Sequence, residues 1–193
     1  MAESLGAQPV NLPYRAFYFS IAAGGSYLSV NDVIANGPYT TLGIKGSAFP
    51  VDLKIGYAFE ENLIVHGDLI SINSISVDVT ADGHPIGTIS GDNSVSMIIF
   101  GAGCTYYFLP SDFFISGTLG GSSFTINKVN SSESTDIGFG LNAKLGKEWR
   151  ISRKWNIGIS MGISYAKVNN EADYMTEKLN GTSLGLLLNA SRY

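Results

Sequence analysis

His66 and Asp68 are the two side chains in this sequence best placed for acid–base chemistry. They stand two positions apart, so in a strand both would point to the same face. A hydrolase triad also needs a serine within hydrogen-bond reach of the histidine and a third group that orients the base. Serines are plentiful, but no motif places one beside His66. We therefore predict no catalytic residue and interpret the pair as part of a polar network inside the protein.

Metal and cofactor chemistry have little support in the sequence. His84 lies near Asp82 and Asp92 in a segment rich in turn formers, which indicates a solvated loop. His66 and His84 are too far apart in sequence to suggest a shared metal site. Cys104 is the single cysteine, which excludes an intrachain disulfide and a multi-cysteine metal site. We predict no bound metal and no cofactor.

Composition narrows the class of protein. Only 15% of the residues are charged, against about 25% in typical soluble domains. No apolar run approaches the roughly 20 residues that a transmembrane helix needs. The net charge of −4 comes without a basic cluster, which argues against nucleic-acid binding. Two classes remain, a β-rich soluble protein and a β-barrel whose apolar residues are dispersed by alternation.

Alternation is clearest between Ile137 and Lys167. Apolar residues there occupy every second position, with glycine or polar residues between them, on both sides of a short charged break at 150–154. Successive strand side chains point to opposite faces, so each run has one apolar and one small or polar face. Trp149 and Trp155 bracket the turn. Two amphipathic strands with aromatic residues at the ends of the apolar face indicate a hairpin that faces lipid.

The same alternation occurs in eight segments, joined by connections that are long and short in turn. Short turns lie near residues 60–62, 109–112 and 150–154, while both termini fall on the short-turn side. Short periplasmic turns, longer extracellular loops and an even strand number are typical of bacterial outer-membrane barrels. We predict an all-β protein, an eight-stranded antiparallel up-and-down transmembrane β-barrel over residues 14–193, after a periplasmic extension over 1–13. The predicted long surface loops are residues 30–47, 74–94, 127–136 and 169–181.

The alternation also assigns side chains to the two faces of the barrel. An eight-stranded barrel is just wide enough for side chains to fill its interior, and buried charges there need partners. The predicted polar network of the lumen comprises Asp52, Lys54, Glu60, His66, Asp68, Lys144 and Glu148. Catalysis or ion passage is the alternative role for these residues. Aromatic residues beside the short turns predict an interfacial girdle, made of Tyr57, Phe59, Phe108, Phe113, Trp149 and Trp155.

From Tyr14 to Tyr193 the pattern resembles the small eight-stranded outer-membrane barrels, the family that includes the OmpA transmembrane domain, OmpX and OmpW. Family members commonly end in an aromatic residue, as this chain does, with apolar residues at alternate positions before it. Here Ser191 and Asn189 occupy those positions. The apolar residues of the last strand are out of phase with Tyr193; they are Leu184, Leu186 and Leu188.

The resemblance implies a monomer embedded in the lipids of a bacterial outer membrane. It also implies export with a signal peptide that is absent from this chain, with Met1 as an added start. The His-x-Ser-type signature of the lipid A-deacylating barrels is missing, so the resemblance implies no enzyme.

Four hypotheses about function follow. The first is a non-enzymatic surface protein whose four long loops contact a partner, an envelope component or a host surface. The second, implied by the resemblance to OmpW, is a narrow or lateral passage for small solutes. The third is an envelope enzyme that modifies lipid, and the fourth is a soluble calycin-like binder.

Overall fold

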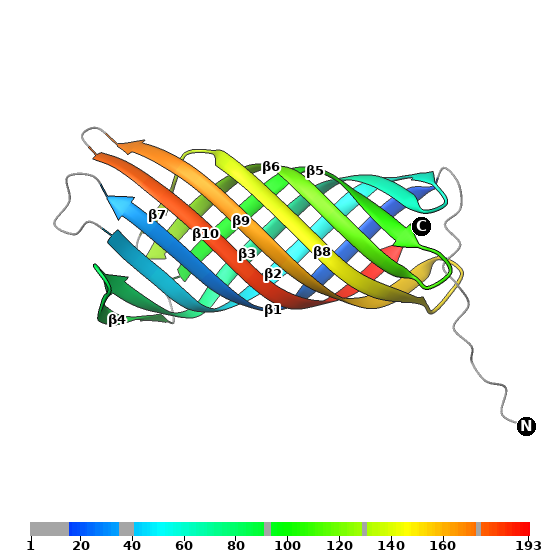
Figure 1. Cartoon of the computed structure of the whole chain (residues 1–193), viewed down its shortest axis with the longest axis horizontal. Helices are drawn as coiled ribbons and strands as arrows, with labels where there is room; N and C mark the ends of the chain where they lie inside the picture. The colour runs from blue at the N-terminus through cyan, green and yellow to red at the C-terminus, as the bar shows by residue number, and fades with distance from the viewer. Residues whose placement is uncertain (1–15, 35–40, 91–93, 129–130, 173–174) are drawn as a thin grey trace, which may run out of the picture.

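A computed structural model describes residues 16–34, 41–90, 94–128, 131–172 and 175–193, and its strands wrap into one elongated barrel (Figure 1). The predicted N-terminal extension, residues 1–13, lies outside the described residues. Among the described residues, no helix is long and apolar enough to cross a membrane.

Eight long strands form the barrel wall. They are β1 (Phe17–Ile34), β2 (Thr41–Glu60), β3 (Leu63–Ala81), β5 (Ser94–Phe108), β6 (Phe113–Lys128), β8 (Gly138–Arg150), β9 (Trp155–Ala172) and β10 (Met175–Arg192). Each pairs antiparallel with the next, and pairing of β1 with β10 closes the ring. A closed ring leaves no unpaired sheet edge inside a membrane, where an unsatisfied backbone group is costly. The predicted eight-stranded antiparallel barrel is confirmed.

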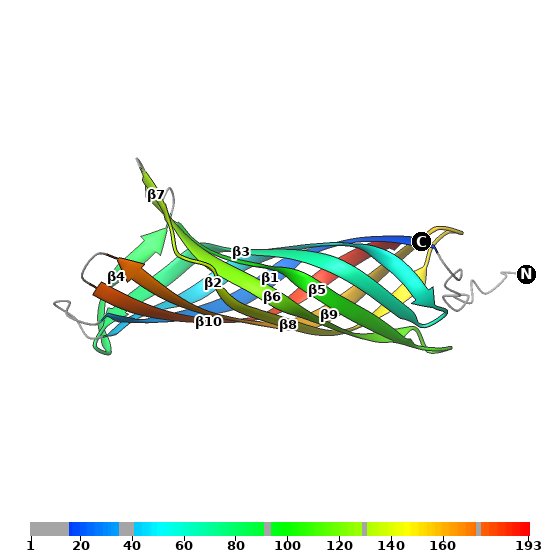
Figure 2. The same cartoon turned by 90° about the horizontal axis from the view of Figure 1, so that it is seen from above.

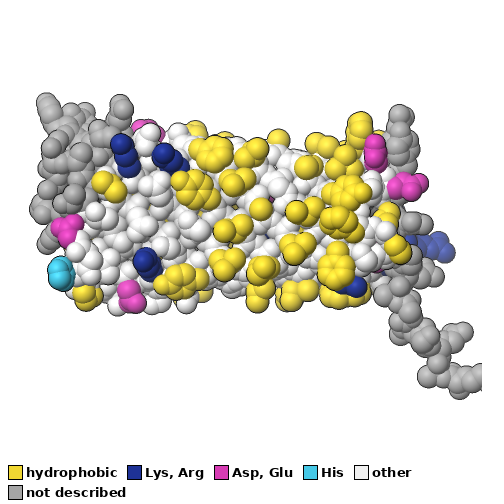
Figure 3. Space-filling model, viewed as in Figure 1, with side chains coloured by type: hydrophobic (Ala, Val, Ile, Leu, Met, Phe, Trp, Pro, Cys, Tyr) yellow, Lys and Arg dark blue, Asp and Glu magenta, His cyan; other side chains and the backbone are white. Residues whose placement is uncertain are grey.

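Aromatic residues mark both edges of an apolar band on the outer surface (Figure 3). On four strands, two outward-facing aromatic residues stand ten positions apart. With a rise of about 3.3 Å per residue and a tilt of about 45°, that spacing spans roughly 23 Å along the barrel axis, close to the ~25 Å apolar band of outer-membrane barrels. The four pairs are Phe17 and Tyr27, Phe49 and Phe59, Phe139 and Trp149, and Trp155 and Tyr165. The band between them is the membrane-spanning part of the wall.

The predicted long loops are mostly strand, so this part of the prediction is wrong. Turn-forming residues are frequent in the four segments for which the sequence predicts loops, 30–47, 74–94, 127–136 and 169–181. In the structure β1 continues to Ile34 and β2 begins at Thr41, and the other three segments are shortened in the same way. Neighbouring strands keep the backbone hydrogen bonds beyond the band, as in the pairing of Val33 with both Lys178 and Thr41. Hydrogen bonding between neighbouring strands therefore outweighs the turn-forming tendency of the local sequence.

Two short strands leave the wall at this loop end. β4 (His84–Ser90) pairs with the end of β3, and β7 (Ser131–Ser134) pairs with the end of β6. Figure 2 shows β7 projecting away from the barrel. The register between β2 and β3 skips Ile75, which marks a β-bulge in β3 there.

Candidate functional site in the barrel lumen

The lumen holds six of the seven charged or histidine residues predicted to face it. The six are buried and come from β2, β3 and β8: Asp52, Lys54, His66, Asp68, Lys144 and Glu148. The exception is Glu60, which is exposed at the last position of β2. A register shift between Ala58 and Glu60 ends the alternation one step early, so counting positions placed Glu60 on the wrong face.

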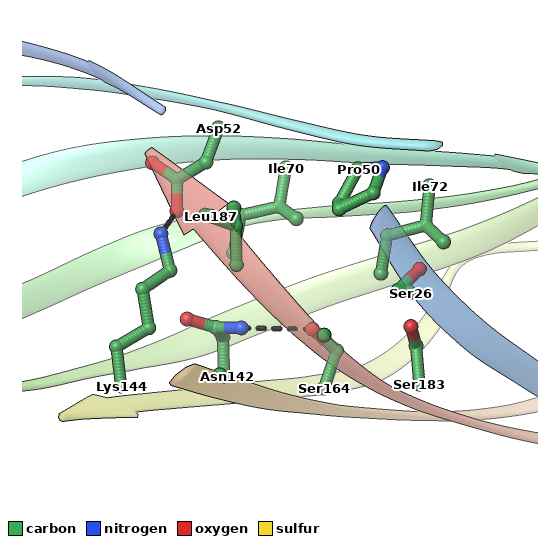
Figure 4. A pocket seen from close by; sticks show the side chains of 12 residues that line it. Ser26, Pro50, Asp52, Ile70, Ile72, Asn142, Lys144, Ser164, Ser183 and Leu187 are labelled. Atoms are coloured by element: carbon green, nitrogen blue, oxygen red, sulfur yellow. Dashed lines mark hydrogen bonds and ion pairs between the residues drawn. The ribbon is translucent and has the colours of Figure 1, made fainter. Parts of the chain in front are cut away.

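The two lysines of this set form ion pairs in the middle of the lumen. Lys144 on β8 pairs with Asp52 on β2, which stands on the opposite side of the eight-stranded ring (Figure 4). Lys54 lies 3.8 Å from Asp68 on the neighbouring strand, between Nζ and Oδ2. Thr118 Oγ1 donates a hydrogen bond of 2.6 Å to the same Asp68 oxygen. In both pairs a buried charge faces an opposite charge. Removing one partner would leave the other buried and unpaired, which would lower the free energy of unfolding by about 3–5 kcal/mol.

His66 and Asp68 share the inner face but are engaged by different neighbours. His66 Nε2 lies 3.0 Å from Thr105 Oγ1, and Thr105 donates to Ser116 Oγ at 2.8 Å. Lys54 Nζ also donates to Ser116 Oγ. A serine beside a lysine is one arrangement that can activate a nucleophile. This contact could not be predicted from sequence spacing, because Lys54 and Ser116 lie on different strands, 62 positions apart.

The space around Ser116 and Lys54 is too small for an organic substrate. The adjoining cavity has a volume of about 10 Å³, and its lining includes Lys54, Thr105 and Glu148. That volume is about enough for one water. A second cavity of the same size lies beside Lys144 and Asp52, with Pro50, Ile70, Ile72 and Leu187 around it (Figure 4). The lumen is filled by side chains at this level.

An aromatic cluster closes the lumen at the short-turn end. Tyr107 donates a hydrogen bond of 3.0 Å to Glu148 Oε2, and Ser191 donates one of 2.7 Å to the same oxygen. Tyr193 donates to the Tyr107 hydroxyl at 2.7 Å, and its ring centroid lies 5.3 Å from that of Tyr18. We call Tyr18, Tyr107, Phe114 and Tyr193, with Glu148 between them, the aromatic floor.

Tyr193 faces inward, which explains its phase in the sequence. Ser191 and Asn189 are buried in the lumen, and the terminal side chain follows the same parity. The outward positions of β10 are instead taken by the leucines at 184, 186 and 188, all exposed. Alternation along β10 predicts the parity of Tyr193, but it does not predict the contacts of Tyr193 with Tyr107 and Glu148 on other strands.

An apolar cluster closes the lumen at the loop end, and the sequence analysis missed it. We call it the apolar plug: Leu28, Val30, Ala48, Ile70, Ile72, Met97, Ile99, Phe124, Ala166, Val168 and Leu179. Every member is 5% exposed or less, so these side chains leave almost no surface open to water. A signal did exist, because these residues have the inward parity of their strands while several outward residues beside them, such as Ser29, Lys167 and Lys178, are polar.

The six residues predicted to form the girdle all lie exposed on the outer wall near the short turns. Their exposed fractions run from 38% at Trp149 to 62% at Phe59. Among the described residues, no group of three or more His, Cys, Asp or Glu side chains is arranged to hold a metal ion.

Comparison with known proteins finds similarity in structure only. No protein-family model matches the chain, and no curated protein matches its sequence. The crystal structure of neisserial surface protein A matches with a TM-score of 0.61 at 12% identity, over 93% of this chain and 99% of that one. The chain has the fold of the small outer-membrane barrels.

Two further barrels agree. The outer membrane protein OprG from Pseudomonas aeruginosa matches with a TM-score of 0.53 at 17% identity, over 92% of this chain and 97% of that one. Outer membrane protein AlkL, solved in DMPC lipid bilayers, matches with a TM-score of 0.50 at 11% identity, over 99% of this chain and 96% of that one. The structural matches establish that the chain shares the fold of these barrels. At such low sequence identity they do not establish its function.

Proposed function

We propose that the protein is a monomeric, non-enzymatic protein of a bacterial outer membrane, with a sealed lumen and a surface-exposed loop end that contacts a partner or envelope component. The single observation that carries the proposal is the closure of the lumen at two levels, the aromatic floor and the apolar plug. Between them Lys144 pairs with Asp52 and Lys54 with Asp68, and the two cavities that described residues line there have room for about one water each.

The outer surface supports the membrane location. Its apolar band is flanked at the short-turn end by the girdle and at the loop end by a second set of aromatic residues. Tryptophan and tyrosine are comfortable at the boundary between acyl chains and water. A soluble calycin-like binder would instead bury these side chains around a ligand cavity, whereas the two cavities that described residues line in the lumen have room for about one water each.

The loop end supports the interaction role. β3 pairs there with β4, and β6 pairs with β7, so two hairpins extend from a rigid wall. Binding residues are often carried by such segments on a rigid scaffold. The described part of this region is built mostly from strands, in place of the long irregular loops that the sequence suggested.

Conductance measurements distinguish this proposal from the hypothesis that the barrel passes small solutes. We expect the purified protein in planar bilayers to give no steady current above the lipid baseline, and its proteoliposomes to exclude small solutes. Stable conductance steps or solute uptake would favour the passage hypothesis instead. Hydrolysis of an envelope lipid that disappears in Ser116→Ala would favour the enzyme hypothesis.

Cysteine labelling on intact cells tests the orientation. In a Cys104→Ser background, Thr88→Cys places a thiol on β4, and Arg153→Cys places one in the turn between β8 and β9. We expect a membrane-impermeant maleimide to label position 88 on intact Gram-negative cells, and position 153 only after the outer membrane is permeabilised. Labelling in the reverse order would contradict the proposed orientation.

A further inference from the structure

The short-turn end of the barrel carries its charges on two opposite sides. The side at the turn between β8 and β9 holds five of the 12 lysine and arginine residues of the chain. We call this set the basic turn: Lys147, Arg150, Arg153, Lys154 and Arg192. The turn between β2 and β3, half a ring away, holds Glu60 and Glu61. Figure 3 shows acidic and basic side chains on different sides of this end.

The basic turn lies directly against the lipid-facing aromatic residues. Lys147 Nζ is 4.8 Å from the ring centroid of Phe113 and 5.9 Å from that of Trp149. Arg192 Cζ is 5.8 Å from the ring centroid of Trp155. A cation over an aromatic face at this distance is attracted by the ring. The three rings belong to the girdle, so these cations are held at the depth of the lipid headgroups.

The hairpin that carries Arg153 and Lys154 has a defined backbone. The amide groups of residues 151 and 152 donate to the carbonyl oxygen of Trp155, at 3.0 and 3.2 Å. Trp155 N donates to Ser152 Oγ at 3.2 Å, and Tyr193 N donates to the Lys154 carbonyl at 3.3 Å. The exposed charges of Arg153 and Lys154 therefore stand on a hairpin tied to the end of the last strand.

Two acidic side chains lie close to this charge among the described residues, and neither is exposed at the outer surface. Glu148 belongs to the same hairpin, but it points into the lumen and is 2% exposed. Asp112, in the neighbouring turn between β5 and β6, is 6% exposed and offsets at most one positive charge. The outer surface of the basic turn is therefore net positive beside a lipid-facing wall.

We propose that the basic turn binds the phosphate headgroups of anionic glycerophospholipids in the leaflet at the short-turn end. Arginine and lysine donate several charged hydrogen bonds to phosphate oxygens, and basic clusters beside a membrane attract anionic lipids. The site is continuous with the surface that already contacts acyl chains, so a bound lipid can fill both at once. A soluble acidic protein would have to enter the headgroup layer to reach Lys147 and Arg192.

The two tryptophans of the chain give a direct test, because both flank the basic turn. The protein is reconstituted into phosphatidylcholine vesicles that contain a fixed minor fraction of brominated lipid, either phosphatidylglycerol or phosphatidylcholine. Bromine quenches tryptophan fluorescence only from nearby lipids. We expect an enrichment of phosphatidylglycerol around the tryptophans of about fivefold over the bulk at low salt, decreasing as salt is added.

Two double variants complete the test. Arg153→Gln with Lys154→Gln should remove most of the preference, whereas Lys45→Gln with Lys178→Gln, which removes the same charge from exposed positions at the other end, should preserve it. Heat-modifiable gel migration verifies that both variants form the barrel. Equal quenching by the two brominated lipids in the natural sequence would overturn the proposal. An unchanged preference in the Arg153 and Lys154 variant would overturn it as well.

Discussion

The membrane-spanning part of the barrel and its loop end use the same strands with opposite polarity. On β9, Ile163 faces outward and is half exposed, while Ser164 is buried in the lumen. Four positions further on, Lys167 is exposed and Val168 is completely buried. The pleat continues without interruption, so the inward and outward positions do not change. What changes is the medium outside the wall, which is acyl chains in one region and water in the other.

This contrast explains how the lumen is closed. Within the membrane the apolar side chains face lipid, so the interior is left with polar groups that must satisfy one another, as Lys144 and Asp52 do. Beyond the membrane the outer surface is polar, and the apolar side chains can turn inward. The apolar plug is therefore the core of a short water-exposed barrel stacked on the membrane-spanning one.

The largest effect should come from breaking the ion pair that crosses the polar region. Lys144→Met leaves Asp52 buried without its partner, and we expect the free energy of unfolding to decrease by about 3–5 kcal/mol. The change is measured by urea-dependent unfolding in lipid vesicles. Adding Asp52→Leu should restore most of the loss, because the unpaired charge is then removed. Equal stability of the single variant and the natural protein would show that the pair is not buried.

A truncation in the apolar plug should cost a similar or slightly smaller amount. Phe124 is completely buried, and Phe124→Ala removes a large side chain from a packed cluster. We expect the free energy of unfolding to decrease by about 3–4 kcal/mol. Truncation of the exposed Leu188 to alanine serves as a control for the loss of a large side chain outside the lumen. If Phe124→Ala were harmless, the loop end would not contain a packed core.

A lysine added to the outer wall should lower the free energy of unfolding by an amount that depends on which of the two regions it is in. Ile159→Lys lies halfway between the aromatic residues of β9, and we expect a loss of about 2–4 kcal/mol. Thr182→Lys lies on the outer surface at the edge of the band, opposite Tyr165 on β9, and should change stability by about 0–1 kcal/mol. Both are measured by reversible folding into vesicles. A similar cost at both positions would remove the distinction between membrane and water.

The smallest effect should come from one hydroxyl of the aromatic floor. Tyr193→Phe keeps the ring against Tyr18 but loses the hydrogen bond to Tyr107. We expect a decrease of about 0.5–1.5 kcal/mol in the free energy of unfolding. Tyr57→Phe, on the exposed outer wall, is the matched control and should have almost no effect. A loss as large as that of Lys144→Met would mean that the floor depends on the hydroxyl network more than on ring packing.

The fold could be predicted from the sequence because alternation survives wherever one face of a strand meets lipid. The same alternation placed Lys54 and Lys144 inside and Trp149 and Trp155 outside. It could not predict that Lys144 pairs with Asp52, because no pattern in the sequence relates residues on opposite sides of the ring. It also failed for Glu60, where a register shift ends the pattern.

The loop end could not be predicted for a different reason. Polar and turn-forming residues there predict loops, although many of them form the water-facing side of continuing strands. Where water replaces lipid outside the wall, the apolar residues of a strand occupy the inward positions instead of the outward ones. A search for outward apolar residues therefore does not detect these parts of the strands. The inward residues Val168 and Leu179 retained the information.

Spin labelling along β9 tests the reversal most directly. Single cysteines at positions 157, 159, 161, 163, 165, 167 and 169, in a Cys104→Ser background, carry a nitroxide in reconstituted vesicles. We predict that collisions with oxygen exceed those with a water-soluble nickel chelate at 157–163, and that the order inverts by position 167. Access to the chelate at every position, or to neither reagent at 157–163, would contradict a wall that faces lipid there and water beyond.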